Sequence, residues 1–201
     1  MHAPTKAHLH ASKNVLRYLK GTADLGLTFG GSELKLHGFV DSNFAAVNTE
    51  GKSVSGYCFF LCGAVISYCS RKQNTVAMST AEAEYMALGL SIMETKYLLQ
   101  LFDELGLSTL VSSCPLTIGE DNQACIKIAE TTQTSFRTRH IDRNWHFSRD
   151  AILKGQVQLK YVPSSENPAY MSTKALRGEL FKRHRATLMN ISDDSPVHTQ
   201  G

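Results

Sequence analysis

Two carboxylates lie two positions apart in the segment STAEAEYMAL, residues 79–88, which otherwise has the pattern of a helix. Helical residues two apart do not share a face, so Glu82 and Glu84 must have different surroundings. The predicted apolar face comprises Ala81, Tyr85, Leu88, Ile92, Leu99 and Phe102. On a helical wheel, Glu84 has the same angular position as Phe102, at the edge of this face. We therefore expect Glu84 to face the interior and Glu82 to meet water, where it favours the helix dipole.

Two further acids lie at the ends of predicted strands. Asp41 ends LKLHGFVD, and Asp121 ends PLTIGED just before a predicted helix. A buried carboxylate without a partner is costly, and two unit charges about 4 Å apart repel by about 4 kcal/mol at an effective dielectric of about 20. If the three acids converge, they must take up protons or hold cations. Oxygen ligands of this kind favour hard divalent ions such as Mg²⁺ or Mn²⁺.

Each acid alone has an ordinary alternative role. Asp41 can form an Asx turn, Asp121 can cap the following helix, and Glu84 can pair with a lysine or arginine. The order of the three, an acid on a strand, one on a helix and one on a second strand, favours a joint site over three separate roles.

The elements that must position these acids follow from periodicity and turn residues. Helices are predicted at residues 5–20, 79–105, 139–154 and most of 168–191, and another begins after Asp121. Strands are predicted at residues 25–29, 34–41, 53–62, 64–72, 115–121 and 156–163. A meander of strands followed by alternating helices and strands predicts an α/β domain with a mixed sheet. The last ten residues are predicted to form a disordered tail.

The composition is that of an ordinary globular chain of 201 residues, with 42% hydrophobic and 19% charged residues. The formal charge of +3 does not repel a polyanion and does not by itself indicate one. Five cysteines without a CxxC pair indicate reduced thiols of an intracellular protein. No apolar run approaches about 18 residues, so no membrane span is expected.

Several ordered motifs resemble the ribonuclease H domain of copia-type retrotransposon polyproteins. GFVDSNFAA resembles the first acid motif of that family, KSVSGYCFFLC its S-x-S-G-Y hairpin, and STAEAEYMAL its acid-bearing helix. EDNQACIKIA resembles the third acid motif, TRHIDRNWHFSRDAI the H-I-D…H-F helix, and ENPAYMSTKAL the closing N-x-A-D-x-x-T-K-x-L. The resemblance extends from about residue 3 to residue 191. Residues 1–30 resemble the end of the reverse transcriptase and its connection, and residues 31–191 the ribonuclease H domain.

The resemblance implies a ribonuclease H-like fold, a five-stranded mixed sheet flanked by helices. It also implies endonucleolytic hydrolysis of the RNA strand of RNA–DNA hybrids with two Mg²⁺ or Mn²⁺ ions. Asp41, Glu84 and Asp121 match the first three acids of the family, which bind the metal ions and catalyse hydrolysis. The implied partners are the hybrid and the reverse transcriptase portion of the same polyprotein. The implied location is the cytoplasm, in virus-like particles if the parent element is active.

The chain also departs from the family pattern. Tyr170 stands where the family has its fourth acid, Asn43 replaces a common aspartate, and Phe44 a tryptophan. A tyrosine is bulkier than a carboxylate and neutral at pH 7, so one metal position should be weakened. We therefore expect impaired cleavage. The alternative is a non-catalytic, retrotransposon-derived protein that binds nucleic acid. A DDE-type integrase domain shares the fold, but the helix glutamate and the hairpin argue against it.

Two groups of residues are candidates for the nucleic-acid surface. Arg139, His140 and Arg143 belong to the densest basic run, and a basic helix edge can follow phosphates. Arg71, Lys72 and Gln73 are predicted to lie in a loop before the acidic helix, where they can contact a backbone or 2′-hydroxyl groups. A solvated surface is the alternative for both groups.

Overall fold

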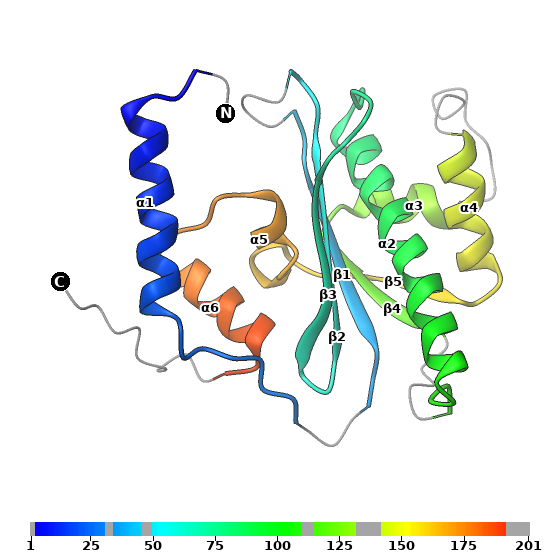
Figure 1. The fold of residues 1–201 in the computed structure, drawn as a ribbon. Coiled ribbons are helices and arrows are strands. Elements are labelled where there is room, and N and C mark those ends of the chain that lie inside the picture. Colours follow the sequence, from blue (N-terminus) through cyan, green and yellow to red (C-terminus); the bar gives the residue numbers. More distant parts are fainter. Residues whose placement is uncertain (1–2, 31–33, 46–49, 110–114, 132–141, 192–201) are drawn as a thin grey trace.

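A five-stranded sheet forms the centre of the computed structural model, which describes residues 3–30, 34–45, 50–109, 115–131 and 142–191, with only the backbone for 142–146 (Figure 1). The strand order is β3-β2-β1-β4-β5. The strands are β1 (His37–Asn43), β2 (Val54–Leu61), β3 (Ala64–Lys72), β4 (Leu116–Glu120) and β5 (Val157–Tyr161). β1, β2 and β3 are antiparallel, whereas β4 pairs in parallel with β1 and β5 in parallel with β4. The predicted mixed sheet is confirmed.

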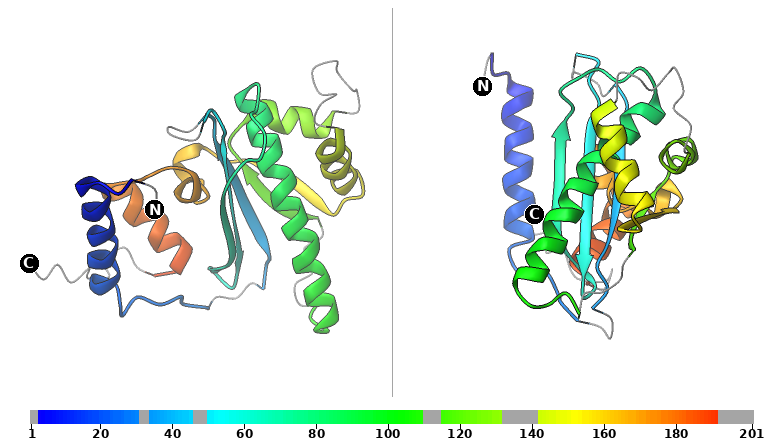
Figure 2. Two further views of the ribbon diagram at one scale, coloured as in Figure 1. Left: turned by 45° about the horizontal axis from the view of Figure 1, so that its top comes forward. Right: turned by 90° about the vertical axis from the view of Figure 1, so that its right-hand side faces the viewer.

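Helices cover both faces of this sheet (Figures 1 and 2). One face carries α2 (Thr80–Glu104), α3 (Gln123–Glu130) and α4 (Asp142–Leu153). The other carries the short α5 (Tyr170–Thr173) and α6 (Gly178–Met189), with a 3₁₀ turn at Ser164–Glu166 before α5. The amino-terminal α1 (Lys6–Gly21) lies beyond α6. The main core packs α2 against β1, β2 and β4, so the acid-bearing helix is fixed along its length.

The hairpin β2–β3 is formed by a two-residue turn. Cys62 and Gly63 both have positive φ, 51° and 84°, the geometry that matches the right-handed twist of the two strands. Six of the eight residues of β2 are buried because α2 covers one of its faces and α5 the other. β2 therefore carries an unbroken apolar run from Gly56 to Leu61 instead of alternating apolar and polar residues.

Helix α2 presents a wider buried face than the helical wheel predicts. Tyr85, Leu88, Ile92 and Phe102 are buried as expected, whereas Ala81 and Leu99 are only partly buried. Ala83, Ala87, Ser91, Thr95 and Leu98 are buried as well. The reason is that α2 packs on the sheet along one side and on α4 along another.

The predicted strand at residues 25–29 is wrong. These residues are extended but join no sheet. Their partners are a helix end and a turn: Thr28 N–H donates to the Met189 carbonyl at 2.9 Å, and Gly30 N–H to the Cys62 carbonyl at 3.0 Å. A β-like sequence here lacks a neighbouring strand edge to pair with. The same segment tethers α1, which buries no residue and touches α6 through Tyr18 and Phe181, with ring centroids 5.8 Å apart.

Other sequence predictions agree with the structure within a few residues. Helix α3 begins at Gln123 with Asn122, not Asp121, as its N-cap. β3 extends to Lys72, so Arg71 and Lys72 belong to a strand end, not to a loop. Residues 139–141 and the predicted tail at 192–201 lie outside the described residues. Cys58, Cys62, Cys69 and Cys125 are free thiols. Among the helices described, none is long and apolar enough to span a membrane.

We predict that Gly56→Ala destabilises the domain by about 1–3 kcal/mol, the range for overpacking a core. Gly56 lies in β2 beneath α5, and a Cβ atom there would be 2.7 Å from both Ser172 Cβ and Thr173 Cγ2. These atoms are close to the α5 backbone and cannot swing away, so the short helix must shift. Urea unfolding measures the change.

Gly26→Ala is the matched control, because a Cβ atom at Gly26 has nothing within 4 Å. It should leave the free energy of unfolding within about 1 kcal/mol of wild type. Equal stabilities for the two variants would show that α5 does not pack tightly on β2.

Candidate metal centre

Three carboxylates from three elements meet beside the carboxyl ends of two parallel strands. Asp41 lies in β1, Glu84 in the second turn of α2, and Asp121 directly after β4. Each offers one oxygen, and these oxygens lie within 4.8 Å of one another. The parallel pairing of β1 and β4 brings the two aspartates to the same end of the sheet, and α2 crosses over them.

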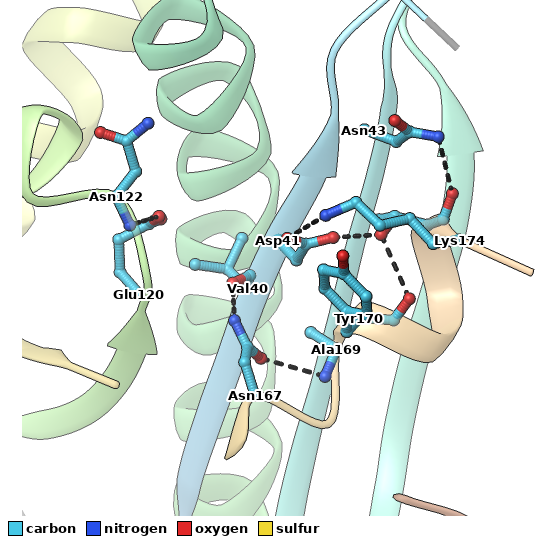
Figure 3. A network of polar contacts seen from close by, with 10 residues as sticks. Val40, Asp41, Asn43, Glu120, Asn122, Asn167, Ala169, Tyr170 and Lys174 are labelled. Carbon is cyan, nitrogen blue, oxygen red and sulfur yellow. Dashed lines mark hydrogen bonds and ion pairs between the residues drawn. The ribbon is translucent and has the colours of Figure 1, made fainter. Parts of the chain in front are cut away.

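Asp41 is fully enclosed. It lies two residues before the end of β1, opposite Gly56 of β2, so it forms no Asx turn. The hydroxyl of Thr173 donates to its Oδ2, and the ammonium of Lys174 lies 3.2 Å from its Oδ1 (Figure 3). Burial raises the pKa of Asp41, and these two donors offset only part of the rise.

Glu84 points into the protein, whereas Glu82 stays at the surface end of the helix. Glu84 is buried, and among the residues that the structure describes its Oε2 has no hydrogen-bond partner. Burial, followed by repulsion from Glu120, Asp41 and Asp121, raises the pKa of Glu84. Glu82 is partly exposed and accepts a hydrogen bond from Met78 N–H at 2.8 Å, while Ser79 caps the helix. The different surroundings expected for the two glutamates are those observed.

A fourth acid, Glu120, lies next to the cluster, and it is buried like Asp41 and Glu84. Glu120, the last residue of β4, is fully buried, and its Oε1 accepts the Asn122 N–H at 2.9 Å. Burial raises the pKa of Glu120, as do the nearby Asp121 and Asp41, against the lowering effect of the Asn122 N–H. When ionised, the carboxylate of Glu120 adds to the negative potential at Glu84.

The segment around α5 closes the site from the other face of the sheet. Asn167 donates to the Val40 carbonyl at 2.8 Å and accepts from Ala169 N–H at 3.1 Å, so it ties the start of this segment to β1 (Figure 3). Asn43 donates to the Thr173 carbonyl at 3.3 Å. Tyr170, at the position of the expected fourth acid, stands beneath the Lys174 ammonium, which is 3.7 Å from the ring centroid.

An open hollow of about 620 Å³ lies in front of the cluster. Its lining residues are Ser42, Asn43, Phe44, Thr80, Glu84, Asp121, Asn122, Gln123, Ser164 and Lys174. The hollow gives an extended polar ligand access to Glu84 and Asp121. Asp41 lies deeper, behind Lys174.

The candidate nucleic-acid residues fall into three groups. Arg71 and Lys72 are exposed at the end of β3, and Lys72 lies 3.5 Å from Glu50. Gln73 is buried, and its amide donates to Ser55 Oγ and the Ala83 carbonyl, both at 2.9 Å. Gln73 thus links β2 to the start of α2. Arg139 and His140 lie outside the described residues, and for Arg143 only the backbone is described.

Sequence analysis assigned no role to four residues of the site, Thr173, Lys174, Asn167 and Glu120, although the first three are the T, K and N of the closing motif. The first three reach β1 from positions more than 120 residues away in the chain. Periodicity carries no signal for such contacts. Glu120 had one signal, because it alternates with the buried Ile118 in a short strand.

Comparison with known sequences relates the chain to retrotransposon polyproteins. It is 36% identical over 181 residues to the "Retrovirus-related Pol polyprotein from transposon TNT 1-94" of Nicotiana tabacum, which is 89% of this chain and 13% of that protein. It is 33% identical over 183 residues to the Pol polyprotein from transposon RE2 of Arabidopsis thaliana, 90% of this chain and 12% of that protein. The chain therefore spans about an eighth of the length of these relatives. No family model matches it.

Comparison of folds gives a consistent result. The structure of LC11-RNase H1, isolated from compost by a metagenomic approach, matches 70% of this chain and 93% of its own with a TM-score of 0.51 and 14% identity. At this identity the match shows the fold, which is the ribonuclease H-like fold that the motifs predicted.

We predict that the metal-free protein loses stability as the pH rises from about 5 to about 8. An unfolded glutamate titrates near pH 4.3, whereas the folded pKa of Glu84 is raised. Between the two values the native state holds more protons than the unfolded state, so stability falls with rising pH. Glu84→Gln should reduce this loss by about 1–3 kcal/mol. Urea unfolding in EDTA at both ends of the range measures it.

Glu82→Gln is the control, because it removes a carboxylate two positions away that lies partly in solvent. It should keep the pH dependence of the wild type. A wild-type pH dependence in Glu84→Gln would mean that Glu84 is not the group whose ionisation opposes folding.

Proposed function

Because the chain belongs to the copia-type retrotransposon Pol polyproteins and has the ribonuclease H-like fold, we propose that it hydrolyses the RNA strand of RNA–DNA hybrids with divalent metal ions. The observation that carries this proposal is the convergence of Asp41, Glu84 and Asp121 on one point beside an open hollow. Residues 31–191 would form this nuclease domain, and residues 1–30 would end the preceding reverse transcriptase and its connection.

The residues present fit a hard divalent cation such as Mg²⁺ or Mn²⁺. All three donors are carboxylate oxygens, and the buried Oε2 of Glu84 has no hydrogen-bond partner in the described part of the chain. An unpartnered buried carboxylate oxygen is costly unless a cation or a proton satisfies it. When bound, such ions activate water as a nucleophile and neutralise charge that develops at the phosphate. We propose two ions at these acids, one of them weakly held.

The protein's own part is to hold the acids in place and to bind the substrate. Asp41 cannot rotate, because Thr173 and Lys174 engage both of its oxygens. Gln73 positions the first turn of α2 by its bond to Ala83. We propose that the exposed Arg71 and Lys72, together with Arg139, His140 and Arg143, contact the phosphates of the hybrid. The compartment would be the cytoplasm.

Tyr170 supports a second candidate, a folded domain that binds nucleic acid but no longer cleaves it. In this chain the position of the fourth acid carries a neutral ring with a lysine ammonium above it. Both groups lower the negative charge available for a second metal ion. Reduced activity and lost activity are therefore the two outcomes to separate.

We predict that Asp41→Asn lowers cleavage of a labelled RNA–DNA hybrid in Mn²⁺ by at least about 100-fold, since it removes the acid that the other two surround.

Tyr170→Asp should raise the wild-type rate by about tenfold or more, because it adds a carboxylate beside the weakened position. Single-turnover cleavage measures both rates, with duplex DNA of the same sequence as the control substrate.

Cleavage that persists in Asp41→Asn would come from another site or another protein and would refute the proposal. Hybrid binding without cleavage, in wild type and in Tyr170→Asp alike, would favour the non-catalytic candidate.

A further inference from the structure

The ammonium group of Lys174 lies inside the acidic site. Its Nζ lies 3.2 Å from Asp41 Oδ1 and 3.7 Å from the centroid of the Tyr170 ring (Figure 3). Its side chain is 27% exposed, whereas that of Asp41 is 0% exposed. Lys174 lines the hollow in front of the cluster and Asp41 does not. The ammonium therefore stands between Asp41 and the solvent from which a cation must enter.

Three contacts fix this position. The Lys174 N–H donates to the Tyr170 carbonyl at 3.0 Å, which closes the single turn of α5. The ring of Tyr170 supports the ammonium from one side, a cation–π contact that strengthens when it is shielded from water. The neighbouring Thr173 binds the other oxygen of Asp41. Both oxygens of Asp41, the most buried of the three cluster acids, are thus engaged before any metal ion arrives.

The charges of the cluster agree with this arrangement. Metal coordination requires ionised carboxylates. In that form Asp41, Glu84 and Asp121 together carry three negative charges. Lys174 neutralises one of them, and the two that remain are equal in magnitude to the charge of a single divalent ion. Tyr170 contributes to the same balance, because a carboxylate at that position would attract the ammonium away from Asp41.

We propose that Lys174 is the resident counter-ion of the acidic cluster and competes with divalent cations for Asp41. A metal ion reaches Asp41 only by displacing the ammonium, so the wild-type site binds metal weakly, and the ammonium offsets one of the three negative charges when no metal is bound. This inference rests on the proposed function only in taking the three acids as a metal site. It does not require that the protein cleave a hybrid.

The direct test is Mn²⁺ binding by calorimetry, without nucleic acid, to the whole chain. Lys174→Met keeps the length of the side chain and removes its charge. We expect it to bind Mn²⁺ roughly tenfold more tightly than wild type, because a unit charge beside the site no longer repels the ion. Lys174→Arg should bind as weakly as wild type. Lys20→Met, which removes the same charge from the exposed face of α1, should leave the affinity unchanged.

A second readout is the melting temperature. In EDTA, Lys174→Met should melt several degrees below wild type, because the buried carboxylates lose their cation, and saturating Mn²⁺ should abolish the difference. If Lys174→Met does not fold, Tyr170→Leu is the variant that tests the proposal. It keeps the lysine but removes the aromatic ring that supports the ammonium. It should bind Mn²⁺ a few-fold more tightly than wild type.

The outcomes separate the two proposals. Equal or weaker Mn²⁺ affinity in Lys174→Met, or in Tyr170→Leu if that variant decides, would overturn the role of Lys174 while leaving the nuclease proposal intact. Tighter binding in these variants, with no cleavage of hybrid by any of them, would support the role of Lys174 and count against the nuclease. No Mn²⁺ binding by any variant would overturn both.

Discussion

The enclosed carboxylate of Asp41 is the constraint that the surrounding structure satisfies. A charge in the middle of a sheet, covered on both faces, has lost its hydration and must find replacement partners from the protein. Here the partners come from one short segment, which supplies the hydroxyl of Thr173 and the ammonium of Lys174. Asn167 holds the start of that segment against β1, and Gly56 leaves the space in which its backbone can approach. Residues far apart in the chain thus serve one buried charge.

The sheet topology accounts for the rest of the cluster. Parallel pairing of β1 and β4 places Asp41 and Asp121 at the same end of two neighbouring strands, and the long α2 crosses that end with Glu84 turned inward. Repulsion among these acids, added to burial, raises the pKa of Glu84. The fold gathers like charges that would otherwise separate, at a cost in stability that a bound cation would offset.

Local pattern was enough to find the three acids, because each signal lies within a single element. The period of α2 separates Glu84 from Glu82, and the strand ends mark the neighbourhood of Asp41 and Asp121. The partners of Asp41 could not be found in this way, since their role depends on a contact across more than a hundred residues. The strand prediction for residues 25–29 was wrong for a related reason: these residues favour a strand, but the Thr28 N–H pairs with the carbonyl of Met189 at the end of α6 and not with a strand. The motifs that resemble a known family compensated for part of this, because their order carries tertiary information that periodicity lacks.

Helix α1 differs from the other helices in how it is attached. It buries none of its residues, and Leu9, Val15, Leu16 and Leu19 are each more than half exposed. An edge-to-face ring contact and the backbone bonds of the following extended segment connect it to the domain. Such a helix adds little to the cooperative unfolding of the sheet, so its amide protons should exchange with solvent through local opening, at a free-energy cost far below that of the amides in β1 and α2.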